Sequence, residues 1–197
     1  KLSLLNIGLN ILAIGVFLTE GLYDISDLRA SYLLQENAEY YNRGAFHLGI
    51  RYVSIAFFAV LMYTCFMYVK QEFTEKKYRV IFDLLFHVSL LWILSSELIG
   101  WMDIAGSGQT YKFGLSILWG VYSLLLIVLG ISQKKKHIRI GAIGLLAITL
   151  LKLFFYDISH LDTIAKTIVF VSLGILLLII SFIYNKYKHV ISDEGES

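Results

Sequence analysis

Proline is absent from this sequence of 197 residues, and cysteine occurs only once. A single cysteine excludes a disulfide within the chain and a cysteine-based metal site. Cys65 lies in an apolar run, where a lone cysteine usually packs as a small hydrophobic side chain. Because proline is a common source of sharp helix kinks, we expect fairly straight helices, with any breaks at Gly or Ser pairs. This disfavours a transporter built on broken helices, which carry Gly and Pro interruptions.

Charged residues are also scarce. They make up 16% of the chain, whereas an ordinary soluble domain has about 25%. Hydrophobic residues make up 57%, and the mean hydropathy is +0.70. A water-soluble fold of this composition has too few polar side chains to cover its core, so we predict an integral membrane protein. The formal charge is +2, and no basic stretch is interleaved with stacking aromatics, so we predict no nucleic-acid partner.

Six apolar stretches are each long enough to cross a bilayer, which takes about 20 residues of α-helix. We therefore predict an all-α fold, a polytopic membrane bundle of six transmembrane helices that forms a single domain over residues 1–197. The predicted spans are approximately residues 2–23, 46–69, 78–102, 113–131, 138–158 and 164–184.

Basic residues gather in alternate loops between these spans. They are Lys70, Lys76, Lys77 and Arg79 after the second span, Lys134, Lys135, Lys136 and Arg139 after the fourth, and Lys186 and Lys188 in the tail. The loops after the third and fifth spans hold only Lys112 and Lys166. Because short loops rich in Lys and Arg stay in the cytoplasm, we predict that both termini are cytoplasmic.

The segment between the first two spans, residues 24–45, is the only sizeable predicted loop, and it lies on the outer face. Leu28, Tyr32 and Leu33, together with Glu36 and Glu39, fit a short amphipathic helix on the outer surface of the membrane. An ordered connector that packs on the bundle fits the same pattern, and both interpretations stay open.

Most ionisable residues inside the predicted spans fall at one depth, in the outer part of the membrane. They are Glu20, Arg51, Glu97, Lys152 and Asp157, with His47 at the edge. A charge inside a bilayer is energetically costly, so such residues pair, line a water-filled cavity or mark a functional site. These six residues form the candidate ligand-binding cluster.

Three interpretations of this cluster remain. In the first, the charges pair to fix helix packing, for instance Arg51 with Glu97, and Lys152 with Glu20. In the second, they line an outward-facing polar pocket for a small polar solute or a lipid headgroup. In the third, they are ordinary interfacial charges at a shallower depth. No His-x-x-x-His or Glu-x-x-His spacing accompanies His47, so we predict no metal site and no cofactor.

Several stretches resemble a known family. They are residues 138–144, 152–161, 170–174 and 181–184, together with 95–98, 118–122 and 130–131. These stretches resemble the C-terminal part of a large bacterial family of predicted membrane proteins, domain of unknown function 2339. The resemblance implies a multi-pass protein of the bacterial inner membrane but no reaction. Family members are typically longer, so it also implies a C-terminal fragment or a compact version.

Three functions fit these observations. The first is a binding or transport module with an outward-open pocket for a polar solute or headgroup. The second is a structural or assembly subunit, or a membrane fragment of a larger envelope protein, with membrane lipid and further membrane segments as partners. The third is an enzyme on outer-leaflet lipid-linked material, with Glu97 or Asp157 as general base. Catalytic motifs are missing, so the enzyme is the least favoured and no catalytic residue is predicted.

Overall fold

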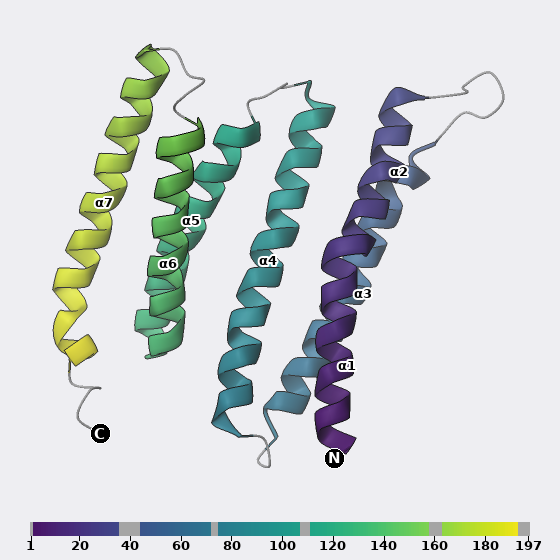
Figure 1. Ribbon diagram of the computed structural model, residues 1–197, viewed down its shortest axis with the longest axis horizontal. Coiled ribbons are helices and arrows are strands. Elements are labelled where there is room, and N and C mark those ends of the chain that lie inside the picture. Colours follow the sequence, from purple (N-terminus) through teal and green to yellow (C-terminus); the bar gives the residue numbers. More distant parts are fainter. Residues whose placement is uncertain (1, 36–43, 72–74, 107–110, 158–162, 193–197) are drawn as a thin grey trace. The chain divides into compact units, whose positions relative to one another are not determined.

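Residues 2–35, 44–71, 75–106, 111–157 and 163–192 are the part of the chain that the computed structural model describes. Every regular element in this part is helical, which confirms the all-α prediction (Figure 1). The elements, with η for a π-helical turn, are α1 (Leu2–Val16), η1 (Phe17–Gly21), α2 (Leu22–Leu34), α3 (Phe46–Val69), α4 (Lys76–Ile104), α5 (Tyr111–Ser132), α6 (Lys136–Lys152), η3 (Leu153–Asp157) and α7 (Thr163–Ser192).

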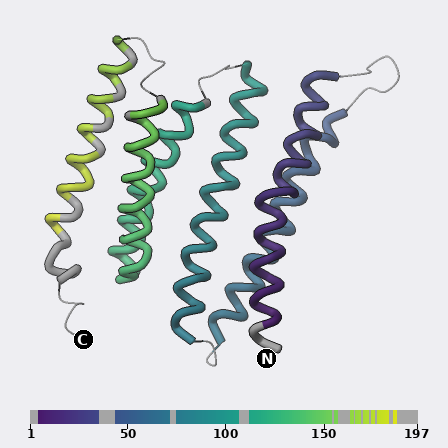
Figure 2. The backbone as a smooth tube through the Cα atoms, in the orientation of Figure 1, coloured from purple at the N-terminus to yellow at the C-terminus, as the bar shows by residue number. Residues whose placement is uncertain are grey.

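The chain divides into two compact units, Lys1–Gly108 and Gln109–Ser197. In the first unit, α1, η1 and α2 form one continuous helix, because Gly21 and Leu22 both keep right-handed helical dihedral angles. Helix α3 runs antiparallel to it, and α4 runs antiparallel to α3 (Figure 1, Figure 2). The predicted single domain over residues 1–197 stays a prediction.

The core of the first unit lies between these helices. Residues of α3 that recur at helical spacing face inward and meet residues of the first helix and of α4. The Phe17 and Phe58 rings stack with their centroids 4.5 Å apart. The buried core residues are Ile14, Leu22, Phe58, Met62, Cys65 and Ile93.

The first helix extends beyond Tyr23, the predicted end of the first span; where the span itself ends stays a prediction. The helix continues to Leu34, and Gln35 after it adopts a left-handed conformation with φ 47°. No Gly or Pro interrupts residues 22–34, and Leu22, Ile25 and Arg29 are buried along one face. That buried face, packed on α3 and α4, stabilises the extension. Glu36 and Glu39, at the end of the predicted amphipathic pattern, lie outside the described residues.

Among the described residues, four helical stretches are long and apolar enough to cross a membrane. They are Leu5–Leu34, Phe46–Val69, Lys76–Ile104 and Lys112–Ser132. Helix α6 continues directly into η3, because Leu153 keeps right-handed helical dihedral angles. The joined helix is not among these four stretches, and it includes Lys136, Arg139 and Lys152. The apolar part of α7 is Lys166–Phe182. The count of six spans and the cytoplasmic termini therefore stay predictions.

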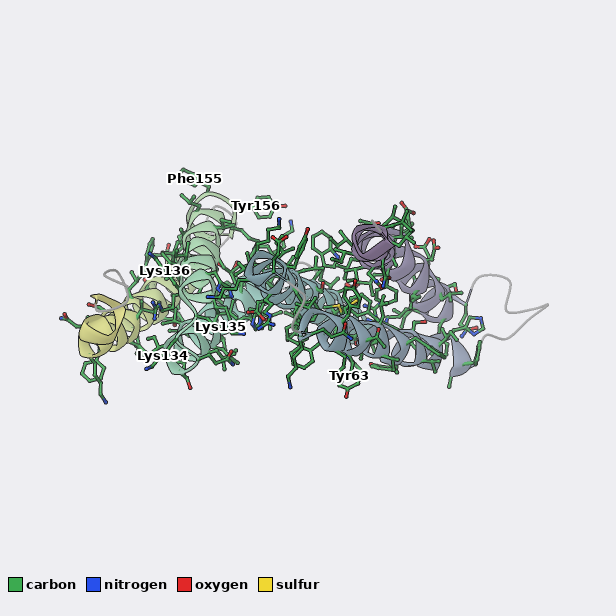
Figure 3. All side chains as sticks on the ribbon, turned by 90° about the horizontal axis from the view of Figure 1, so that it is seen from below. Tyr63, Lys134, Lys135, Lys136, Phe155 and Tyr156 are labelled. Atoms are coloured by element: carbon green, nitrogen blue, oxygen red, sulfur yellow. The ribbon has the colours of Figure 1, made fainter. Side chains whose placement is uncertain are left out.

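Large apolar side chains cover the outside of the first unit. On α3, Phe57 is 74% exposed and Val60 is 59% exposed, and Tyr63 projects away from the helix (Figure 3). Contiguous exposed apolar surface of this kind is typical of contact with lipid or with another apolar surface.

In the second unit, α5 and α6 pack as an antiparallel pair, and α7 contacts α5. The turn between α5 and α6 carries Lys134 and Lys135, and Lys136 begins α6 (Figure 3). The turn is closed by a hydrogen bond of 2.9 Å from the Lys135 N–H to the Gly130 carbonyl. A Cβ atom at Gly130 would lie 2.7 Å from Cγ of Arg139. Only glycine therefore allows the two helices to approach this closely.

In the described part of the chain, two π-helical turns interrupt the otherwise regular helices, although the chain has no proline. The turn η1 ends at Gly21, as the expectation of breaks at glycine allows, but η3 contains neither Gly nor Ser. The expectation therefore missed the π-helical turn, which inserts an extra residue into a helix without needing either residue type.

Candidate functional site

Arg51 of α3 is the centre of a buried polar cluster in the first unit. Its side chain is 1% exposed. Its Nε–H donates to Oε1 of Glu97 on α4, and its Nη2 donates to Oγ of Ser96 at 2.7 Å. Its Nη1 donates to Oγ of Ser26 on α2 at 3.1 Å. One guanidinium group therefore joins three helices.

The Ser26 hydroxyl can accept from Arg51 because it donates its own hydrogen within α2. This hydroxyl donates to the carbonyl oxygen of Leu22 at 2.7 Å, which leaves the oxygen lone pairs for the guanidinium.

The Glu97 carboxylate accepts from two further residues. Nη2 of Arg29, on α2, donates to its Oε1 at 3.4 Å, and the Tyr52 hydroxyl donates to its Oε2 at 3.3 Å. The side chains of Arg29 and Glu97 are 7% and 17% exposed. Two buried cations thus share one carboxylate, and the cluster of Arg29, Arg51 and Glu97 carries a formal charge of +1. A buried charge is stable only when it is paired or hydrogen-bonded, so this excess favours an additional anion.

Gly100 fixes the place of the Arg29 guanidinium. A Cβ atom at Gly100 would overlap Nη1 of Arg29, so the guanidinium occupies the space that any other side chain would fill. Gly100 follows Glu97 by three residues, which places both on the same face of α4. The sequence of α4 therefore supplies both the partner of Arg29 and the space for it.

A cavity of about 210 Å³ adjoins this guanidinium, between α2 and α4. It is lined by Ser26, Arg29, Ala30, Leu33, Ser96, Ile99, Gly100 and Asp103. An arginine has five N–H donors, and Arg29 makes only the bond to Glu97 within the described residues. Arg29 thus brings unused donors to a space large enough for a ligand.

The two remaining candidates of the first unit are Glu20 and His47. Glu20 lies in η1 and is exposed, and no hydrogen bond or ion pair joins its side chain to another described residue. His47 is half-buried at the start of α3, where its Nδ1 lies 3.2 Å from the Gly44 carbonyl oxygen. Their part in ligand binding stays a prediction.

Lys152 and Asp157 lie in the second unit. Nζ of Lys152 donates to the Lys112 carbonyl oxygen at 3.0 Å and to Oγ of Ser116 at 2.8 Å. Nζ of Lys112 in turn lies 5.2 Å from the ring centroid of Tyr156. Asp157 ends η3, but its side chain lies outside the described part. The pairing of Lys152 with Glu20 therefore stays a prediction.

The predicted pairing of Arg51 with Glu97 is confirmed, but five residues around it were missed. Arg29 and Ser26 were assigned to a loop, and Tyr52, Ser96 and Gly100 carry no charge that would single them out. The available signal was the spacing of Leu22, Ser26 and Arg29, which places them on one helical face if the first helix continues. No group of three or more His, Cys, Asp or Glu residues that suits a metal ion occurs among the described residues.

The helices and the buried charges define a helical, multi-pass membrane protein. A family model described as predicted membrane protein (DUF2339) matches residues 2–187. The chain therefore belongs to this family, in agreement with the resemblance seen in the sequence. No curated protein and no solved structure matches the chain.

Proposed function

We propose that the first unit binds the anionic group of a small polar solute or of a lipid headgroup, in the cavity beside Arg29. The observation that carries this proposal is the excess positive charge of a buried cluster that borders an open space. The planar guanidinium of arginine matches carboxylate and phosphate oxygens in two parallel hydrogen bonds. An anion in the cavity would supply the acceptors that the Arg29 donors lack.

The size of the cavity supports a ligand rather than one trapped water. A single buried water needs only about 10–15 Å³ of such space, and this cavity has about 210 Å³. A second cavity in the first unit, of about 50 Å³, is lined mainly by apolar residues such as Ile14 and Phe82. Size and polarity therefore both favour the cavity at Arg29.

The proposed orientation places this cavity toward the outer face of a bacterial inner membrane, in a chain of six spans with cytoplasmic termini. Asp103 and Gly100 lie near the end of α4, and Lys76, Lys77 and Arg79 lie at its start. Basic residues at the start of α4 favour the cytoplasmic side for that end. The cavity would then be open to solutes from outside or to headgroups of the outer leaflet.

A structural or assembly role is the second candidate, and Arg51 favours it. This guanidinium has acceptors on two other helices, so helix packing alone accounts for it. Arg29 distinguishes the two functions, because a purely structural cluster has no need of a second cation on the same carboxylate. In this second function, the partners would be lipid and further membrane segments.

Native mass spectrometry of the full chain tests the binding proposal. The purified protein is incubated with a mixture of phosphatidylethanolamine, phosphatidylglycerol and their deacylated headgroups, and retained adducts are counted. We expect Arg29→Gln to reduce retention about 10-fold, since a charge-assisted hydrogen bond contributes about 1.5–3 kcal/mol. Arg79→Gln removes the same charge at the other end of α4 and should leave retention nearly unchanged. Equal retention by wild type and Arg29→Gln would contradict the proposal.

A further inference from the structure

Asp103 lines the same cavity as Arg29, from the facing helix. Its side chain is exposed, and no hydrogen bond or ion pair joins it to another described residue. One cavity thus presents a buried cation from α2 and an acid from α4 that do not contact each other. The proposed binding of an anion explains the cation but gives no part to the acid.

We propose that the ligand is a zwitterion, with its anionic group on Arg29 and its ammonium group at Asp103. This inference rests on the proposed function and adds the charge pattern of the ligand. With Asp103 included, the four charged residues Arg29, Arg51, Glu97 and Asp103 sum to a formal charge of zero. A site that is neutral overall but separates its charges matches a ligand with the same property.

The separation of the two charges limits the length of the ligand. The guanidinium of Arg29 lies against Gly100, and Asp103 is three residues further along α4, a rise of about 4.5 Å. Side chains on a helix lean toward its N-terminus, so the Asp103 carboxylate leans back toward Gly100. Single bonds are roughly 1.5 Å long. A short linker, such as the two carbons of an ethanolamine group, is therefore long enough to join the anionic and the ammonium group.

Asp103 would also select against other ligands. A simple anion on Arg29 would meet the negative charge of Asp103, and a simple cation at Asp103 would meet Arg29. Repulsion between a charge of the site and a like charge of the wrong ligand is a common source of specificity. Because Asp103 is exposed to screening by solvent and salt, we expect a preference of several-fold rather than an absolute choice.

The shared chemistry, a phosphodiester joined to an ammonium by two carbons, occurs in a lipid headgroup and in a free solute. Four probes separate these sources. Glycerophosphoethanolamine and glycerophosphoglycerol have the same phosphodiester, but only the first has an ammonium group. The corresponding diacyl lipids add the membrane anchor. A stronger response to the diacyl pair identifies a lipid headgroup, and an equal response identifies a free solute. Either source is consistent with a zwitterion site.

Isothermal titration of the full chain in micelles with these probes tests the inference. Wild type should bind the ethanolamine probe about 5-fold more tightly than the glycerol probe, a difference of about 1 kcal/mol. Asp103→Asn, an isosteric change at an exposed position, should remove this preference while binding of the glycerol probe persists or improves. Arg29→Gln should weaken both probes about 10-fold.

The outcomes separate the two proposals. Equal binding of both probes by wild type, or a preference for the ethanolamine probe that survives Asp103→Asn, overturns the proposal of a zwitterionic ligand. If binding still depends on Arg29 in that case, the proposed anion binding is upheld. Binding of both probes that is unchanged in Arg29→Gln overturns the proposed function itself. Gly100→Ala displaces the same guanidinium without removing it. It therefore provides a second variant if Arg29→Gln does not fold.

Discussion

At the scale of single residues, the unequal number of charges in the buried cluster decides what each substitution does. Glu97 is the one acid that contacts both Arg29 and Arg51 among the described residues. Removing it leaves two buried cations without a counter-ion, whereas removing Arg51 leaves Arg29 paired with Glu97. The two substitutions should therefore differ in effect, although they break the same ion pair.

We predict that Glu97→Gln lowers the free energy of unfolding by about 3–5 kcal/mol, the usual effect of leaving a buried charge without its partner. Arg51→Met should lower it by less. Reversible unfolding in mixed micelles measures both values. Lys77→Gln breaks an exposed pair with Glu75 and is the control, with no measurable change expected. A larger loss from Arg51→Met than from Glu97→Gln would contradict this charge distribution.

A substitution at Gly100 should change ligand binding without lowering the stability of the fold. An added Cβ atom would overlap Nη1 of Arg29, so Gly100→Ala should move the guanidinium and weaken ligand retention about 10-fold, as Arg29→Gln does. Alanine favours the helix by up to about 1 kcal/mol over glycine, so thermal stability should hold or rise. Gly49→Ala on α3, where a Cβ atom meets nothing within 4 Å, should leave retention unchanged. If Gly100→Ala and Gly49→Ala retain ligand equally, the Arg29 guanidinium does not lie against Gly100 in the ligand site.

At the scale of helices, the continuation of the first helix through η1 into α2 creates the site. It brings Ser26 and Arg29 to the cluster, and Leu33 and Ala30 to the cavity. A chain that turned onto the membrane surface after Tyr23 would leave Arg51 and Glu97 as a simple pair, without the second cation and without the cavity.

Proline at Asp27 tests this continuity. Asp27 is exposed in the middle of α2, and proline inside a helix costs about 3 kcal/mol or more. Asp27→Pro should therefore lower stability by about that amount and weaken ligand retention, while Asp27→Ala should change neither. Hydrogen exchange should show the amides of residues 22–34 protected in Asp27→Ala and exposed in Asp27→Pro. Similar stability and exchange in the two variants would indicate a surface loop instead.

Helix positions were predictable where a long apolar run decided them. The predicted span 46–69 coincides with α3 (Phe46–Val69), and the predicted spans 78–102 and 113–131 lie within α4 and α5. The end of the first helix was not predictable from hydropathy, because Asp24, Asp27 and Arg29 resemble a loop when their partners are unknown. Arg51 and Glu97 were predictable as a pair from their shared depth. The pairing of Arg29 was not predictable, since it depends on the continuation of the first helix beyond Tyr23, which the hydropathy pattern does not indicate.

At the scale of the whole molecule, the distribution of basic residues predicts the direction of every span. In a Cys65→Ser background, single cysteines at exposed positions report this direction through labelling of intact cells with a membrane-impermeant maleimide. Ala105→Cys should be labelled from outside. Gln71→Cys and Lys134→Cys should be labelled only after the cells are permeabilised. Labelling of Ala105→Cys and Lys134→Cys from the same side would contradict the six-span topology.

The most direct test of a ligand site at Arg29 is an experimental structure of the full chain in a lipid phase that contains phosphatidylethanolamine. We predict that Arg29 lies against Gly100 and that a phosphate group in the cavity is within about 3 Å of its guanidinium nitrogens. We also predict an ammonium group on the Asp103 side. A closed cavity in which Arg29 turns away from Gly100 and pairs directly with Asp103 would contradict a ligand site, and would leave the cluster a structural role.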